Sequence, residues 1–253
     1  MTASKLSAVL VGAVVAAHAA PGPPVIDPAL RPLTVGVMLK FEQKPPSGFV
    51  KRLGTAVREI FRPSGLDVRL EVFDNNLRPK EYNRAVVVEM RGACPMVPPD
   101  LGPSNQPDRA TLGFTRIQEG EVIPFSMVDC EQLVRIVQGV RAQTPNRLFL
   151  YTAYWNAMGR VMAHELMHML LRTADHRETD CLRSPVRAGD LQFSARLNPA
   201  EIAALRQIGD PRVSAAASRD KAEAKGNTGP SRRGRGEQFV FSTFVAGDDS
   251  GPR

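Results

Sequence analysis

The sequence contains few residues of several chemically reactive types. It holds three cysteines, four histidines and one tryptophan among 253 residues. It contains no internal repeat, which excludes the repeat architectures, and no glycine-rich phosphate loop, which removes that route to nucleotide binding. After the amino terminus, no apolar run approaches the roughly 18 residues of a membrane-spanning helix. We therefore expect no transmembrane segment in the mature chain.

The three cysteines, Cys94, Cys130 and Cys181, fit an oxidising compartment with one disulfide and one remaining thiol. The sequence cannot fix the pairing. We favour Cys94 with Cys130, because both flank the strand pair that we expect before the histidine-bearing helix. Cys181 lies five residues after His176 and could bind a metal instead.

The amino terminus has the pattern of a secretory signal peptide. Lys5 precedes an apolar stretch from Leu6 to Ala17, and Ala17-His18-Ala19 matches the small-x-small cleavage rule. We predict a signal peptide at residues 1–20, cleaved near Ala19/Ala20, and a proline-rich linker at 21–30. The mature protein is then expected to be secreted or periplasmic.

Composition divides the rest into a folded domain at 31–212 and a basic, disordered tail at 213–253. From Ser214 to Gly236 the tail carries six basic and two acidic residues, 6 − 2 = +4 of the formal +7. Such a tail can contact anionic surfaces, but nothing in it predicts specific nucleic-acid binding. Residues 239–245 are strand-like and could add to a sheet edge or occlude the cleft.

Three of the four histidines, His164, His168 and His176, fall within thirteen residues. Two histidines four apart on a helix lie on one face and can hold a single zinc ion, while Glu165 can serve as general base on the water that the metal activates. The surrounding residues 161–171 are otherwise apolar, which predicts a buried helix. A metal would compensate the cost of burying polar groups there.

A catalytic zinc usually takes three protein ligands, and His176 is the first candidate for the third. The helix must then end near Arg172 or Thr173 and fold back, and we expect Asp175 to adopt the left-handed conformation at that turn. Asp175, Glu178 and Asp180 are rival carboxylate ligands. Glu201 is another rival, although Asn198-Pro199-Ala200-Glu201 reads better as a capping box.

His164-Glu165-x-x-His168 with a later histidine resembles the zincin metallopeptidases, and among them the metzincins, over about 70 residues from Thr111 to the loop after His176. The resemblance implies zinc ligands at His164, His168 and His176 and a catalytic base at Glu165. Three features depart from the metzincin pattern: Leu171 replaces the turn glycine, Ala174 replaces the third histidine, and no methionine follows Met169. The motif is also similar to that of uncharacterised predicted secreted bacterial proteins.

Hydrophobic periodicity predicts an α+β fold with a mixed sheet. The resemblance implies a zincin-like single domain, in which the twisted sheet carries an active-site helix and a backing helix. The expected strands are 33–41, 66–73, 84–90, 111–117 and 122–128, and the expected helices are 50–61, 131–141 and 148–172. In zincins the strand before the active-site helix pairs with the substrate backbone, so Leu112-Gly113-Phe114 is the candidate edge.

These observations predict a secreted zinc metallopeptidase that acts on peptides or proteins. Two alternatives stay open: a catalytically inactive zincin-fold binding protein, and a zinc amidase acting on a cell-wall component. All three tyrosines precede the motif, which excludes a downstream tyrosine as the donor that stabilises the transition state and leaves Arg172 or a backbone amide of the edge strand as candidates.

Overall fold

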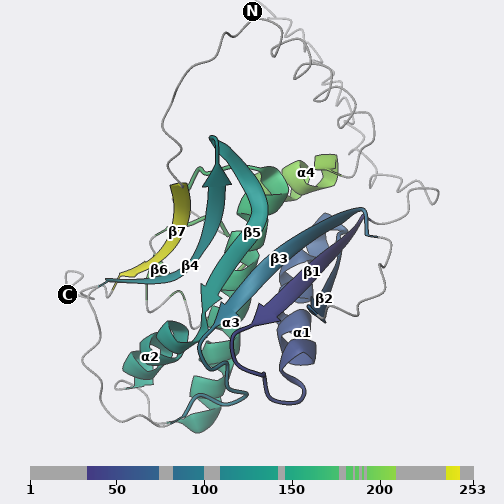
Figure 1. The fold of residues 1–253 in the computed structure, drawn as a ribbon. Coiled ribbons are helices and arrows are strands. Elements are labelled where there is room, and N and C mark those ends of the chain that lie inside the picture. The colour runs from purple at the N-terminus through teal and green to yellow at the C-terminus, as the bar shows by residue number, and fades with distance from the viewer. Residues whose placement is uncertain are drawn as a thin grey trace, which may run out of the picture. The chain divides into compact units, whose positions relative to one another are not determined.

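The computed structural model describes residues 33–73, 82–99, 109–141, 146–176, 181–184, 186–187, 190, 193–208 and 238–245. Within these ranges seven strands form one sheet, in the order β2-β1-β3-β5-β4-β7-β6 (Figure 1). The strands are β1 (Thr34–Phe41), β2 (Asp67–Val72), β3 (Arg84–Arg91), β4 (Arg109–Gln118), β5 (Glu121–Asp129), β6 (Val186–Arg187) and β7 (Gln238–Val245).

The sheet is mixed. Strand β1 runs parallel to β2 and β3, and β3 runs parallel to β5. Strand β4 is antiparallel to both of its neighbours, β5 and β7. The hairpin between β4 and β5 turns at Glu119 and Gly120, whose φ angles are 53° and 80°. Positive φ at both central residues is what a tight hairpin turn with the twist of its strands requires.

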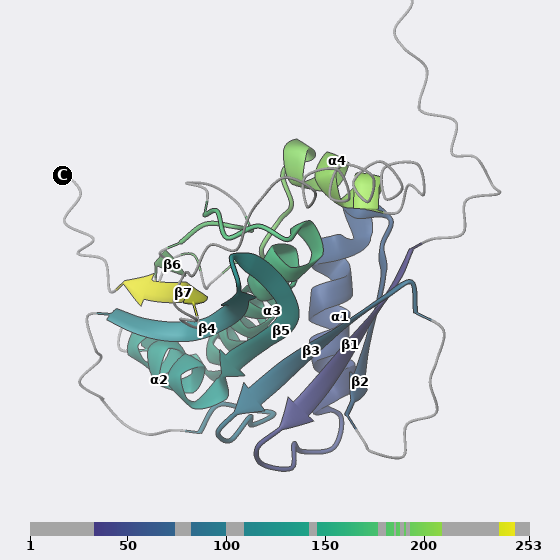
Figure 2. The same cartoon turned by 45° about the horizontal axis from the view of Figure 1, so that its top comes forward.

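The helices are α1 (Phe49–Phe61), α2 (Cys130–Arg141), α3 (Arg147–Leu171) and α4 (Pro199–Ile208), with a short 3₁₀ turn, η1 (Arg62–Ser64). Helices α1 and α3 lie behind the same face of the sheet (Figures 1 and 2). They pack closely, since the Phe49 and Trp155 rings lie 5.3 Å apart. The predicted α+β class is confirmed, with α3 as the histidine-bearing helix and α1 as the backing helix.

Strand alternation decides which residues enter the core. Val35, Val37 and Leu39 of β1 and Val86 and Val88 of β3 are buried, as expected for the sheet face that the helices cover. The buried side chains of α1, among them Leu53, Val57 and Ile60, pack on this face. The burial of apolar side chains between sheet and helices is the main stabilising term of the fold.

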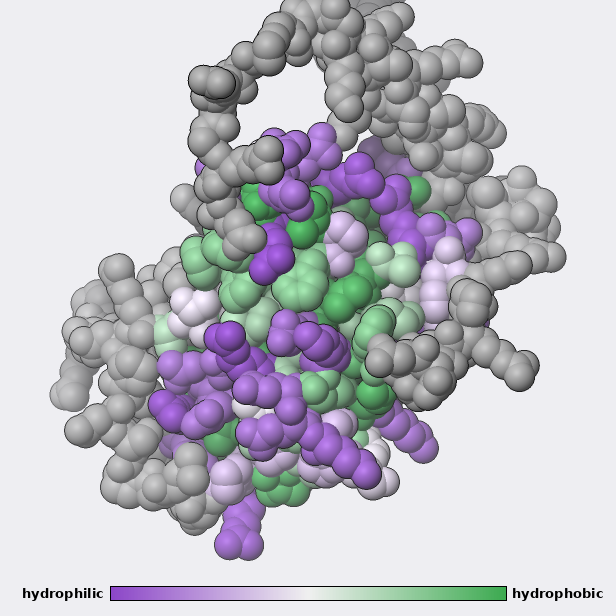
Figure 3. Space-filling view, viewed as in Figure 1, coloured by the Kyte–Doolittle hydropathy of each residue, from purple (hydrophilic) through white to green (hydrophobic). Residues whose placement is uncertain are grey.

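The other face of the sheet carries the alternate residues. Figure 3 shows hydrophobic residues gathered in its middle, bordered by hydrophilic ones. On this face the Phe114 ring contacts the rings of Phe239 and Phe241, and the Arg116 guanidinium lies over the rings of Phe125 and Phe239. These contacts attach β7 to β4 through side chains as well as through the backbone.

Strand β7 changes the predicted domain boundary. The domain expected at 31–212 omits residues 238–245, which instead form a strand of the sheet beside β4. Backbone pairing and the aromatic contacts hold this strand, which confirms that the strand-like residues 239–245 add to a sheet. The predicted signal peptide, the linker and residues 213–237 of the tail lie outside the described residues.

A disulfide joins Cys94, in the loop after β3, to Cys130, the first residue of α2. The favoured pairing is thus confirmed, and Cys181 remains a buried thiol. In the part of the chain that the structure describes, no helix has the length and hydrophobicity to cross a membrane.

Candidate metal centre

Helix α3 runs through the interior of the protein and carries His164, Glu165 and His168. Its first turn is capped by Asn146, whose side-chain oxygen accepts a hydrogen bond from the Leu148 amide at 2.9 Å. Because the helix is apolar on nearly all sides, it is buried between the sheet and the other helices. His164, Glu165 and His168 are at most 1% exposed, so each of them needs a partner inside the protein.

Backbone carbonyl groups orient the two helix histidines. The Cys181 carbonyl lies 2.8 Å from His164 Nδ1, and the Thr173 carbonyl lies 2.7 Å from His168 Nδ1. A carbonyl oxygen can only accept, so each Nδ1 carries the proton and donates it. In a neutral ring Nε2 then presents a lone pair. The two Nε2 atoms lie 2.9 Å apart and point at one place.

At neutral pH no proton lies between the two Nε2 lone pairs, because both rings are neutral. Burial, with the nearby His168 as a further cause, lowers the pKa of His164 to about 3. Burial also lowers the pKa of His168 to about 4. Both rings are therefore neutral near pH 7, which is the state that a metal ion requires of imidazole ligands.

His176 joins the two helix histidines. One ligand atom from each of the three residues lies within 4.8 Å of the others. The His176 ring stacks on His164 at 5.2 Å and meets His168 edge-on at 4.9 Å. Unlike the other two, His176 is exposed, so the cluster reaches the surface on its side. The sequence pattern alone could not establish this meeting, since it depends on how α3 ends.

The reversal after α3 differs from the sequence-based expectation. Asp175 was predicted as the left-handed residue, but Arg172 takes this conformation, with φ 51° and ψ 43°. The Arg172 and Thr173 amides both bond to the His168 carbonyl. This turn immediately after Leu171 brings the Thr173 carbonyl to His168 and His176 to the cluster.

The three histidines fit a zinc ion. Nitrogen ligands of tetrahedral zinc, at about 2.1 Å from the metal, lie roughly 3.4 Å from one another. The two helix-histidine Nε2 atoms are 2.9 Å apart, and the ligand atoms of all three histidines lie within 4.8 Å of one another, so the zinc value falls within this range. Two buried lone pairs held at 2.9 Å repel each other, and a cation between the rings removes the repulsion. Among the described residues no carboxylate joins this group.

The Glu165 carboxylate points toward the sheet. The Thr115 hydroxyl donates to Glu165 Oε2 at 2.6 Å, and the Ser126 hydroxyl lies 3.3 Å from the same oxygen. Oε1 faces Gly113, where a Cβ atom would stand 2.8 Å from it. Glu165 therefore sits in a fixed pocket formed by β4 and β5, one residue along the helix from His164.

Sequence reasoning missed Thr115, Ser126 and the two carbonyl groups that orient the histidines. Ordinary polar residues in strands give no signal by themselves. The register in which Thr115 pairs with Ser126 across β4 and β5 is what places both hydroxyls over α3. That register is a property of the folded sheet.

The rival ligands stand elsewhere or outside the described residues. Glu178 and Asp180 fall in the latter class. Asp175 is exposed and outside the cluster. Glu201 forms the predicted capping box: its amide donates to Asn198 Oδ1 at 2.8 Å, and its Oε2 accepts from the Asn198 amide at 2.9 Å. Cys181 contributes its carbonyl to His164.

The predicted substrate edge is occupied. Residues Gly113–Ile117 of β4 pair with β5 on one side and β7 on the other, so Leu112-Gly113-Phe114 lies inside the sheet. A peptide cannot add to β4 while β7 holds that position. The strand-like pattern of residues 239–245 allows such a pairing, but it does not specify β4 as the partner, because β7 is more than a hundred residues away along the chain.

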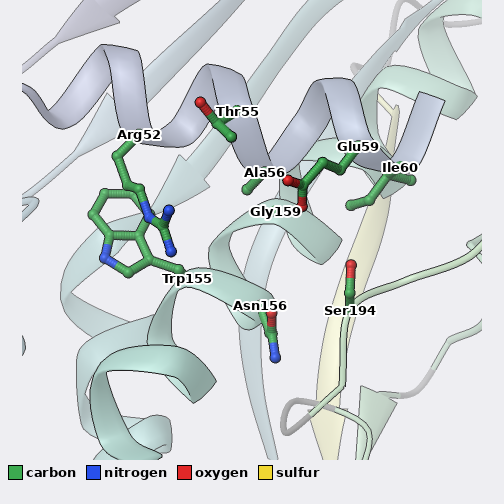
Figure 4. Close-up of a pocket in the computed structure, with 9 residues that line it drawn as sticks. All are labelled: Arg52, Thr55, Ala56, Glu59, Ile60, Trp155, Asn156, Gly159 and Ser194. Atoms are coloured by element: carbon green, nitrogen blue, oxygen red, sulfur yellow. The ribbon is translucent and has the colours of Figure 1, made fainter. Parts of the chain in front are cut away.

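A small pocket between α1 and α3 is separate from the histidine cluster. Figure 4 shows Arg52 and Glu59 of α1 facing Trp155 and Asn156 of α3 around it. None of the residues lining this pocket belongs to the cluster.

No protein-family model and no curated protein matches the sequence. Among solved structures, the chain is similar to the crystal structure of archaemetzincin from Methanopyrus kandleri. The identity is 11%, the match covers 70% of this chain and 95% of that one, and the TM-score is 0.38.

Proposed function

We propose that the protein is an exported zinc-dependent hydrolase that cleaves peptide bonds. The observation that carries the proposal is the convergence of the His164 and His168 Nε2 atoms, 2.9 Å apart, with both Nδ1 atoms bound to carbonyl groups. His176 completes a three-histidine set. Hydrogen-bonded second nitrogens are characteristic of histidines that bind metal.

A zinc ion held by His164, His168 and His176 would supply Lewis-acid polarisation of the substrate carbonyl and activation of a water molecule. Glu165 would take the proton from that water and deliver it to the leaving amine. The Thr115 hydroxyl donates to Oε2, and Oε1 faces Gly113 of β4. The short bond from Thr115 holds this carboxylate against β4, while the Ser126 hydroxyl, which donates to the Phe114 carbonyl at 2.8 Å, lies 3.3 Å from Oε2.

The first experiment measures zinc per mole of purified mature protein by elemental mass spectrometry. Wild type is compared with His164→Ala and His176→Ala. One zinc in wild type and loss in both variants supports the three-histidine site. Zinc retained by His176→Ala would move the third ligand elsewhere, and a wild type that binds no zinc after reconstitution would refute the proposal.

Glu165→Gln then separates an enzyme from an inactive zincin-fold binding protein. The amide keeps the size of the side chain but cannot accept the proton. If the protein is an enzyme, the variant keeps its zinc and loses cleavage by about 10²-fold or more. A binding protein would show no cleavage in wild type or variant.

The occupied edge of β4 favours a second candidate function. Because β7 pairs along β4, a substrate that does not bind as an added strand fits the structure better than a long extended peptide. A zinc amidase acting on a cell-wall component would have such a substrate. Casein, gelatin and peptidoglycan fragments, assayed in parallel with wild type and Glu165→Gln, distinguish the two candidates.

Export is part of the proposal. The Cys94–Cys130 disulfide is compatible with an oxidising compartment. The signal-peptide pattern supports secretion or transfer to the periplasm, and amino-terminal sequencing of the secreted protein would test cleavage near Ala19. We further propose that the basic tail contacts anionic surfaces rather than specific nucleic acids, which binding to anionic vesicles at increasing salt would test.

A further inference from the structure

One peptide group connects the capping box of α4 with the histidine cluster. Its carbonyl oxygen belongs to Cys181 and accepts a hydrogen bond from His164 Nδ1 at 2.8 Å. Its amide nitrogen belongs to Leu182 and donates to Glu201 Oε1 at 3.3 Å. A carboxylate, a peptide group and an imidazole therefore lie in series.

The burial of Glu201 exceeds what helix capping requires. A capping-box glutamate needs one oxygen for the amide of the N-cap residue, and Glu201 Oε2 fills this role with Asn198. Yet Glu201 is 0% exposed, and its second oxygen binds the Leu182 amide. Glutamate is seldom fully buried unless its charge is compensated. The amino-terminal end of α4 and two backbone donors provide that compensation.

The two helix histidines differ in how their carbonyl partners are held. Thr173, the partner of His168, follows directly on the end of α3, and its amide bonds to the His168 carbonyl. Cys181, whose carbonyl orients His164, lies 17 residues after His164 in the sequence. It therefore needs an anchor from another part of the fold, and Glu201 supplies one.

We infer that Glu201 is a positioning residue for the zinc ligand His164, acting through the Cys181–Leu182 peptide group. This inference rests on the proposed zinc site. The buried carboxylate fixes the peptide plane and polarises it, which strengthens the carbonyl as an acceptor of the His164 Nδ1 proton. The Nε2 lone pair then becomes a better donor to zinc. Carboxylates that bind a zinc-ligating histidine directly have this effect, and here one peptide group is interposed.

The test compares Glu201→Gln with Asn198→Ala in the full chain. Glutamine has nearly the same shape but no charge and one acceptor oxygen, so it cannot serve both the Leu182 and the Asn198 amides. Asn198→Ala removes the other half of the capping box, the Oδ1 acceptor of the Glu201 amide, and leaves the Leu182 contact in place. Zinc affinity is measured by competition with a chromophoric chelator, and thermal unfolding of the metal-free proteins compares their stability.

Glu201→Gln is expected to weaken zinc binding by about 10-fold, the lower end of the effect of a direct partner. Asn198→Ala should lower the unfolding temperature but change zinc affinity less than twofold. Wild-type affinity in Glu201→Gln, or equal weakening in both variants, would overturn the inference while leaving the proposed function intact. If Glu201→Gln does not fold, Glu201→Asp replaces it, because its shorter carboxylate cannot span both amides, and wild-type affinity would again refute the role. A wild type without zinc affinity would instead refute the proposed function itself.

Discussion

Replacing Gly113 with alanine tests whether the sheet fixes the position of Glu165. A Cβ atom at residue 113 would stand 2.8 Å from Glu165 Oε1 and 2.8 Å from the Met127 carbonyl oxygen. Both distances are well below van der Waals contact, so both contacts must be relieved. The backbone of Gly113 does not have positive φ, so the effect comes from space rather than from backbone conformation.

Two magnitudes follow from this crowding. Overpacking a close-packed interior costs about 1–3 kcal/mol of unfolding free energy. Relief of the contact with the Met127 carbonyl requires a shift of the backbone pairing between β4 and β5, and relief of the contact with Oε1 displaces the Glu165 side chain. Displacing a catalytic group by about 1 Å costs on the order of 10²-fold in rate. We therefore expect Gly113→Ala to fold, to keep its zinc and to cleave about 10²-fold more slowly.

The assay combines zinc content, urea unfolding and cleavage rate. Gly54→Ala is the control, because its Cβ atom would meet only the mobile end of Arg58 at 3.3 Å. Within α1 this change should stabilise the protein by about 0.5–1 kcal/mol without affecting cleavage. In the Glu165→Gln background, Gly113→Ala should cause no further loss of rate, because both changes act on one carboxylate.

Wild-type cleavage by Gly113→Ala with full zinc content would refute the reasoning. A further loss in the Glu165→Gln background would also refute it, because Gly113 would then act by a route other than Glu165.

Three more predictions concern the turn, the disulfide and the histidines. Arg172→Gly should raise the unfolding free energy by about 1 kcal/mol, because the left-handed conformation of Arg172 costs a residue with a side chain about 1–2 kcal/mol. Arg172→Val should lower the unfolding free energy. Urea denaturation measures both changes. Replacing Cys94 and Cys130 together by serine should lower stability by about 4 kcal/mol through the 36-residue separation, and an unchanged urea midpoint would contradict this. The metal-free protein should lose stability as pH falls below about 6.5, because unfolding frees a buried histidine to bind a proton. With the pKa of His168 lowered to about 4 in the folded state, that residue contributes a loss of about 3 kcal/mol by pH 4. Flat stability over this range would refute the burial of the histidines, and His168→Gln should reduce the slope.

The sequence predicted the regular elements well where local pattern and packing agree. Helix α3 was expected at 148–172 and spans Arg147–Leu171. Strand β1 was expected at 33–41 and spans Thr34–Phe41. In both cases nearly every apolar residue of the pattern points into the core, so periodicity alone contains the answer.

The errors concern contacts between segments that are distant along the chain. The left-handed residue after α3 is Arg172 rather than Asp175. The hydrogen bond between His168 Nδ1 and the Thr173 carbonyl outweighs the intrinsic preference of aspartate for the left-handed conformation. The substrate edge predicted at Leu112-Gly113-Phe114 is covered by β7, a pairing that local pattern cannot specify. A strand propensity predicts that a segment will pair, but the partner depends on the whole sheet.

What the sequence determined by itself is the set of chemical groups: three clustered histidines, Glu165 between two of them, and a helix too apolar to lie at the surface. What only the tertiary structure decided is their environment. The Cys181 and Thr173 carbonyls fix which nitrogen of each helix histidine faces the cluster, and Thr115 and Ser126 fix the Glu165 carboxylate. The sequence alone gives the chemical identity of each side chain. Hydrogen-bond direction and burial depend on segments that come together only when the sheet and helices have packed.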